Sequence, residues 1–94
     1  KSLIKELQQI AKKVLAEKGQ IQVIGHTDNS GTAAVNQKYG QQRADAIKAL
    51  LLEFGVPGER ILAASKGETE PIASNESAAG RRQNRRVEVI TIMN

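Results

Sequence analysis

The spacing of apolar residues predicts two amphipathic helices, over residues 2–17 and 33–53. In the first, apolar residues recur three or four positions apart from Leu3 to Leu15, which is the period of a helix with one buried face. In the second, the positions that we expect to face the core are Val35, Tyr39, Ala46, Ile47, Leu50 and Leu51. The first half of this helix is much more polar than the second half, so burial alone does not explain its sequence.

Three shorter segments have the composition or the alternation of β-strands, at residues 20–26, 61–66 and 85–92. Residues 71–77 have the composition of a loop and lead to a short helical turn before Gly80. A strand, a helix and a strand in succession form a βαβ unit whose strands are parallel. The pattern therefore predicts an α/β (α+β) two-layer sandwich, in which helices cover one face of a mixed sheet of three strands.

The length of the chain is that of one small domain, which we expect to extend over residues 1–94. The sequence as given has no apolar run long enough to span a membrane and no export signal at its start. It contains no cysteine, which excludes disulfides and thiolate metal sites. The net charge of +4 is modest, but four arginines lie within residues 81–86, so we consider an acidic partner.

Candidate binding residues follow the first strand and continue along the second helix. Asp28 lies just past the end of the strand, at the edge where open α/β sheets bind ligands. Asn36 and Arg43 share one face of the helix, about 10 Å apart along its axis, and Gly40 between them would leave room for a ligand. Asp28 and Arg43 could thus hold the ammonium and the carboxylate of a zwitterion. The alternative is that Asp28 caps a turn or the helix and that Arg43 lies on a solvated face.

Five motifs occur in the order and spacing of one known family. They are GHTDNSG at residues 25–31, N-x-x-x-x-x-x-R-A at 36–44, GVPGERI at 55–61, GETEP at 67–71 and G-R-x-x-N-R-R-V-E at 80–88. With them the chain resembles the OmpA-like C-terminal domain from about residue 3 to residue 92. The resemblance implies a domain without enzymatic activity or cofactor, which anchors an envelope protein to peptidoglycan in the periplasm of the Gram-negative cell envelope.

The resemblance also implies which residues bind. Asp28 and Arg43 match the pair that clasps the distal ammonium and carboxylate of diaminopimelate in the peptidoglycan stem peptide. Asn36 and Arg85 match residues that line the groove, and Thr27 flanks the Asp, so these three are expected to support the site.

The chain departs from the family at three places. The family usually has Leu-Ser where this chain has Tyr39 and Gly40, and a glycine where this chain has Ser65. The sequence given also begins directly in the first helix, whereas the family normally begins with a strand. A sheet that lacks this strand has an exposed edge, from which we expect either a homodimer or marginal stability.

Two other functions are open to these residues. His26 and Asp28 alternate along an extended segment, as a catalytic pair or metal ligands could, but the sequence has no second His, no Cys and no G-x-S-x-G motif to complete such a site. We therefore expect no enzyme and no metal, and a His26 side chain that is hydrogen-bonded at the strand end. Arg81–Arg86 could instead bind nucleic acid, but Tyr39 and Phe54 are expected to pack inward, which leaves no platform for stacked bases.

Overall fold

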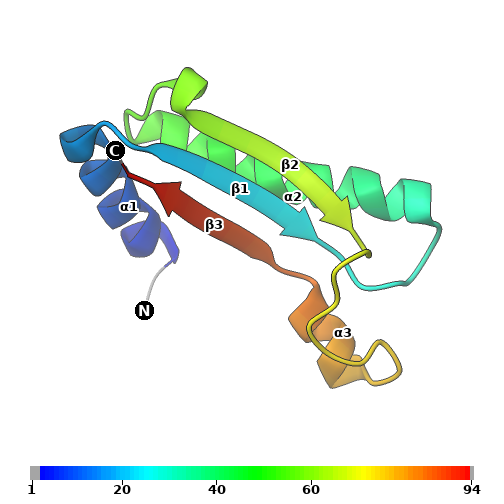
Figure 1. Ribbon diagram of the computed structural model, residues 1–94. Helices are drawn as coiled ribbons and strands as arrows, with labels where there is room; N and C mark the ends of the chain where they lie inside the picture. The colour runs from blue at the N-terminus through cyan, green and yellow to red at the C-terminus, as the bar shows by residue number, and fades with distance from the viewer. Residues whose placement is uncertain (1–2, 94) are drawn as a thin grey trace.

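The computed structural model describes residues 3–93 and shows a mixed sheet with helices on one face (Figure 1). The elements in chain order are α1 Leu3–Glu17, β1 Gln20–His26, α2 Ala33–Glu53, a 3-10 turn Gly58–Arg60, β2 Ile61–Gly67, α3 Ala78–Asn84 and β3 Val87–Ile92. The predicted fold class is confirmed, although the first residue of the predicted helix 2–17 lies outside the described part. Within residues 3–93, no helix is both long and apolar enough to cross a membrane.

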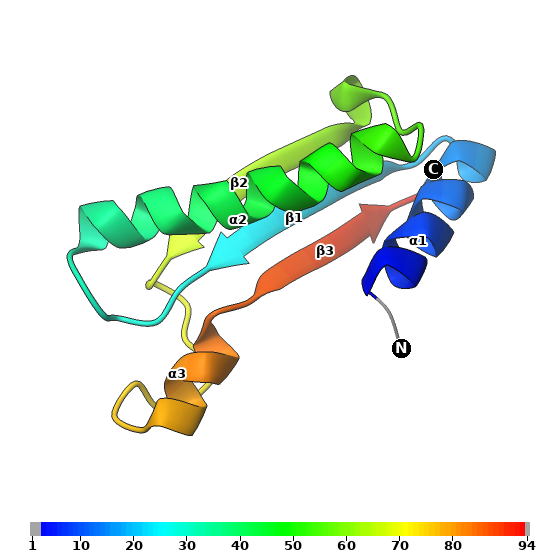
Figure 2. The same ribbon diagram turned by 180° about the vertical axis from the view of Figure 1, so that it is seen from behind.

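The three strands are ordered β2-β1-β3. β1 runs parallel to β2 and antiparallel to β3, so the βαβ unit formed by β1, α2 and β2 is confirmed. α2 extends along one face of the sheet, while α1 and α3 lie near opposite ends of β3 (Figure 2). The parallel strands β1 and β2 therefore end, and β3 begins, at the same edge of the sheet.

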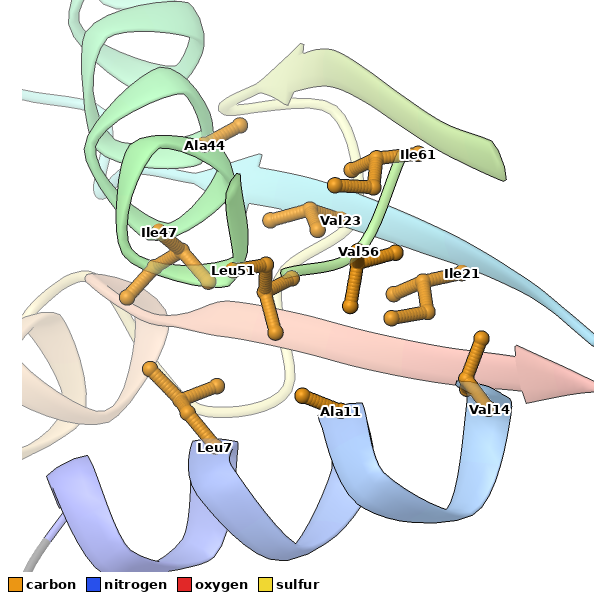
Figure 3. Packing of buried hydrophobic residues seen from close by; sticks show 10 residues of the cluster. All are labelled: Leu7, Ala11, Val14, Ile21, Val23, Ala44, Ile47, Leu51, Val56 and Ile61. Atoms are coloured by element: carbon orange, nitrogen blue, oxygen red, sulfur yellow. The ribbon is translucent and has the colours of Figure 1, made fainter. Parts of the chain in front are cut away.

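The hydrophobic core lies between this face of the sheet and the helices (Figure 3). α1 contributes Leu7, Ala11 and Val14, which are spaced as one helical stripe and are almost completely buried. They meet side chains of α2 and β1, including Leu51 and Ile21. Since burying one such large aliphatic side chain contributes roughly 1.5–3 kcal/mol, this cluster is what holds the two layers together.

The predicted core face of α2 is wrong in its first half. Val35 and Tyr39 are 41% and 50% exposed, and Ala46 is exposed as well. The residues of α2 that are buried are Asn36, Gly40, Ala44, Ile47 and Leu51. The buried stripe thus begins with a polar residue and a glycine, and at the glycine the helix comes too close to the sheet for a larger side chain.

α2 comes very close to the sheet at Gly40. A Cβ atom on Gly40 would lie 2.1 Å from the Oγ atom of Ser65, and a Cβ atom on Gly25 would lie 1.9 Å from the carbonyl oxygen of Gly40. Two glycines therefore face each other across the helix–strand contact. The expectation that Gly40 leaves room for a ligand is wrong, since this space is filled by β1 and β2.

The C-terminal part also differs from the prediction. α3 continues past Gly80 to Asn84, and Arg85 is its C-cap, donating its backbone N–H to the carbonyl of Arg81. β3 therefore begins at Val87 rather than at residue 85. Neither Arg85 nor Arg86 belongs to a strand, so their side chains need not point to opposite faces of the sheet.

The outer edge of β2 is partly closed by side chains of α2. Gln37 and Gln41 donate their amide N–H groups to the carbonyls of Ser65 and Ala63, at 2.6 and 3.1 Å. These carbonyls belong to an edge strand and would otherwise be open to a strand of another chain. Dimerisation through a free sheet edge stays a prediction, but this edge is poorly suited to it.

Candidate functional site

The predicted site residues gather at the edge where β1 and β2 end and β3 begins. The loop after β1 carries Thr27 and Asp28, the first half of α2 carries Asn36 and Arg43, and Arg85 is the C-cap of α3. This is the edge at which the strands of a βαβ unit present their carboxyl ends, the usual place for a ligand in such sheets. The candidate site is thus assembled from the loop after β1, the helix that follows it, and the end of α3, which is far from both in the sequence (Figure 1).

Asp28 is a buried carboxylate with a partner on each oxygen. Its Oδ1 atom accepts the backbone N–H of Ser30 at 2.9 Å, and its Oδ2 atom accepts from the Arg85 guanidinium at 2.5 Å. The hydrogen bond from Ser30 lowers the pKa of Asp28, burial raises it and Arg85 lowers it again, with a net shift below the ordinary value. Asp28 is therefore ionised at neutral pH, and the alternative that it caps a turn is partly realised through Ser30.

Thr27 fixes the loop that carries Asp28. Its hydroxyl donates to the backbone carbonyl of Asp28 at 2.8 Å, and its own N–H donates to the carbonyl of Gly67 at 2.9 Å. Gly67 has a φ of +52° and follows a register shift at the end of β2, a conformation that favours glycine. Thr27 therefore holds the Asp28 loop at the end of β2, and its buried hydroxyl is already hydrogen-bonded to the backbone.

Arg43 and Asn36 face the sheet from α2 but reach different partners. Arg43 is half-buried and donates to the backbone carbonyl of His26 at 2.9 Å. His26 precedes Asp28 by two residues, so the Arg43 guanidinium contacts the end of the strand that leads to Asp28. Asn36 is fully buried and donates its amide to the carboxylate of Glu68 at 2.6 Å. Glu68 lies in the GETEP motif, but nothing in the spacing identified it as a partner of Asn36.

Asn84 is a further residue that sequence analysis missed. It is fully buried, and its Oδ1 atom accepts the backbone N–H groups of Ile72 and Ala73. Its amide donates to the Ala73 carbonyl and to Asn75. Asn84 thus fastens the loop after β2 to α3 immediately before Arg85, and so helps to place the partner of Asp28.

His26 is buried beside the site without the predicted side-chain hydrogen bond. Its Nε2 atom lies 3.3 Å from the Oε1 atom of Glu88, but neither ring nitrogen has a partner with hydrogen-bond geometry. Burial raises the pKa of Glu88, while Arg86 and the nearby His26 lower it, with a net shift below the ordinary value. In residues 3–93, no group of three or more His, Cys, Asp or Glu side chains could hold a metal ion.

The arginine cluster is largely engaged within the protein. Arg81 donates to the carbonyl of Asn75, Arg85 to Asp28, and Arg86 to Glu88 and to the carbonyl of Glu70. Such contacts leave fewer cationic groups for phosphates than a nucleic-acid interface uses, which disfavours that function. The prediction that Tyr39 packs inward, from which we excluded base stacking, is wrong, but this tyrosine lies on α2 rather than within the cluster.

The sequence matches the OmpA family over residues 1–85, and the chain belongs to this family. A relative, the outer membrane porin F of Pseudomonas fluorescens, is 50% identical over 68 residues, which are 72% of this chain and 21% of the porin. The chain thus spans about a fifth of that protein's length. OmpA-like domains are non-enzymatic anchors, so the expectation that the chain is not an enzyme is confirmed.

Two solved structures are similar along nearly the whole chain. The peptidoglycan-associated lipoprotein of Burkholderia pseudomallei has a TM-score of 0.89 and 32% identity, covering 94% of this chain and 75% of that one. The cell wall anchor of the T6SS from Pseudomonas aeruginosa has a TM-score of 0.76 and 40% identity, covering 95% and 64% of the two chains. The predicted fold and the expected location in the bacterial cell envelope are both confirmed by these relatives.

Proposed function

We propose that this domain binds peptidoglycan non-covalently and thereby anchors a parent envelope protein to the cell wall in the periplasm. Family membership supports this proposal, as do the two similar structures, one named as peptidoglycan-associated and one as a cell wall anchor. The ligand is the diaminopimelate residue of the stem peptide, whose side chain ends in an ammonium and a carboxylate on one carbon. The parent protein is a membrane-associated envelope protein, and the domain binds no nucleic acid.

The observation that carries the proposal is the placement of opposite charges at one sheet edge. Asp28 is ionised and held by Ser30, so it presents a fixed anion, while Arg43 is oriented by the carbonyl of His26 at the end of the adjacent strand. A guanidinium holding one carbonyl has further donors for a carboxylate. In the proposed complex Asp28 accepts from the ligand ammonium, and Arg43 donates to its carboxylate.

The supporting residues shape the loop and the walls around this pair. Thr27 holds the Asp28 loop against β2, and Asn36 joins α2 to Glu68 on the segment that follows β2. Both side chains are buried and already hydrogen-bonded, so we assign them to positioning rather than to direct contact. Arg85 is different, because its guanidinium is partly exposed and contacts the binding carboxylate itself.

Co-sedimentation with purified, insoluble peptidoglycan sacculi tests binding, and titration with soluble stem peptides tests the ligand. Removing one member of a buried, hydrogen-bonded charge pair across an interface typically costs about 2–5 kcal/mol, so Asp28→Ala or Arg43→Ala should weaken binding of a diaminopimelate peptide roughly 30-fold or more. Arg82→Ala is the matched control, because Arg82 is exposed on α3. A peptide with lysine keeps the distal ammonium and lacks the distal carboxylate, so Arg43→Ala should change its binding little. Equal losses for both peptides would show that Arg43 does not hold the carboxylate.

A further inference from the structure

The carboxylate of Asp28 is not freely accessible in the structure. Its side chain is only 8% exposed, and Arg85 donates to its Oδ2 atom. A buried carboxylate without a counter-ion is costly, so a ligand must either share Asp28 with Arg85 or replace it. The site as folded therefore already contains one ion pair of the kind that the ligand would form.

The two members of this pair differ in how firmly they are held. Asp28 is fixed by Ser30 and by the loop contacts of Thr27, whereas the Arg85 side chain is 40% exposed and reaches Asp28 from the end of α3. The backbone of Arg85 is anchored by its bond to Arg81 and by the neighbouring Asn84. The guanidinium can therefore turn toward solvent while its backbone stays in place, and Asp28 cannot.

We propose that Arg85 acts as a gate that makes the site require a zwitterion. A ligand with only an ammonium that replaces Arg85 at Asp28 leaves the guanidinium without its carboxylate. A ligand with a carboxylate beside the ammonium returns a partner to Arg85 when it takes Asp28, so ion pairs are exchanged rather than lost. Arg85 is on this view a specificity-determining residue, distinct from Arg43, which holds the ligand carboxylate in the proposed function on which this inference rests.

The test compares two stem peptides, ending in meso-diaminopimelate or in lysine, by calorimetric titration of wild type, Arg85→Gln and Arg85→Lys. Arg85→Gln should bind the lysine peptide about five- to tenfold more tightly than wild type, since a charged hydrogen bond no longer competes for Asp28. The preference for diaminopimelate should fall by a similar factor. Arg85→Lys keeps the charge and should stay within about twofold of wild type for the lysine peptide.

If Arg85→Gln only disrupted the local structure, it would have the opposite effect, because a disordered site would bind both peptides more weakly. An unchanged or weaker affinity of Arg85→Gln for the lysine peptide, together with strong loss in Asp28→Ala, overturns the gate and leaves the proposed function standing. If the wild type binds neither peptide, the gate and the proposed function are both wrong. An independent measurement follows the side-chain N–H signals of Arg85 by NMR in the wild-type protein: the diaminopimelate peptide should shift them, and the absence of a shift contradicts the exchange.

Discussion

Gly40→Ala tests whether the close contact between α2 and the sheet depends on Ser65. The new Cβ atom would lie 2.1 Å from Ser65 Oγ and 2.9 Å from the carbonyl oxygen of Gly25, and both distances are too short for a Cβ atom without a shift of its neighbours. Overpacking of this kind costs about 1–3 kcal/mol, while alanine gains about 1 kcal/mol over glycine within a helix. Gly40→Ala should therefore lower the free energy of unfolding by up to about 2 kcal/mol in the wild type.

In a Ser65→Gly background the clash with the Ser65 side chain is absent, while the contact with the Gly25 carbonyl oxygen and the helical gain remain. Gly40→Ala should then cost less than in the wild type, with a coupling energy of at least about 1 kcal/mol between the two positions. Urea unfolding followed by circular dichroism measures all four variants. Gly58→Ala is the control, because its Cβ atom meets only a Leu52 methyl group at 3.6 Å, and it should show no coupling to Ser65→Gly. An equal cost of Gly40→Ala in both backgrounds refutes this account of the contact.

Three other perturbations have defined outcomes. Asn84→Ala leaves the backbone N–H groups of the loop without acceptors and should cost roughly 2–4 kcal/mol in urea unfolding, whereas a cost below about 1 kcal/mol would show that water replaces the side chain. The double variant Gln37→Ala, Gln41→Ala opens the β2 edge and should promote concentration-dependent association in sedimentation velocity, so a variant that sediments as the wild type does would contradict edge protection. Because the folded state lowers the pKa of Asp28, its contribution to stability is present at neutral pH and is lost as the pH falls below about 4 through the folded pKa. In urea unfolding, Asp28→Asn should therefore lose less stability than the wild type between pH 7 and pH 3. Equal losses would show that Asp28 does not contribute to the pH dependence of stability.

The periodic parts of the sequence predicted the fold well. The bounds of β1 and α2 agree with the prediction, because alternation and helical spacing extend over each whole element. The predictions that are wrong concern positions where a polar or small residue is buried in place of an apolar one. Val35 and Tyr39 have the spacing of core residues, yet the helix buries Asn36 and Gly40 in their place. The close approach of the sheet explains the glycine, and the hydrogen bond to Glu68 satisfies the buried amide of Asn36. Helix spacing contains no information on either contact.

The site was predicted as a set of residues rather than as a set of contacts. Spacing relates Asn36 to Arg43 because both lie on one helix, but the Asp28–Arg85 pair joins positions 57 residues apart. Its geometry depends on α3, which the sequence predicted only as a short turn before Gly80. Arg85 and Arg86 extend the alternating pattern of the strand, so the sequence predicts that the strand begins with them. The hydrogen bonds of Asn84 that fix the end of α3 instead are made to a segment more than ten residues away, which local sequence does not reveal.

The departure from the family at Gly40 and Ser65 is physically one change rather than two. The resemblance implies a serine at position 40 and a glycine at position 65 in the family, so this chain has the reverse arrangement, and the two positions contact each other. The Ser65 hydroxyl also accepts the backbone N–H of Gly67 at 3.1 Å, and Gly67 in turn accepts from Thr27, which precedes Asp28. The small residue and the hydroxyl thus exchange places across one interface, while the loop that presents Asp28 keeps its attachment to β2. The missing serine on α2 therefore gives no reason to expect a displaced carboxylate, and the reciprocal variant Gly40→Ser, Ser65→Gly should bind the diaminopimelate peptide as the wild type does.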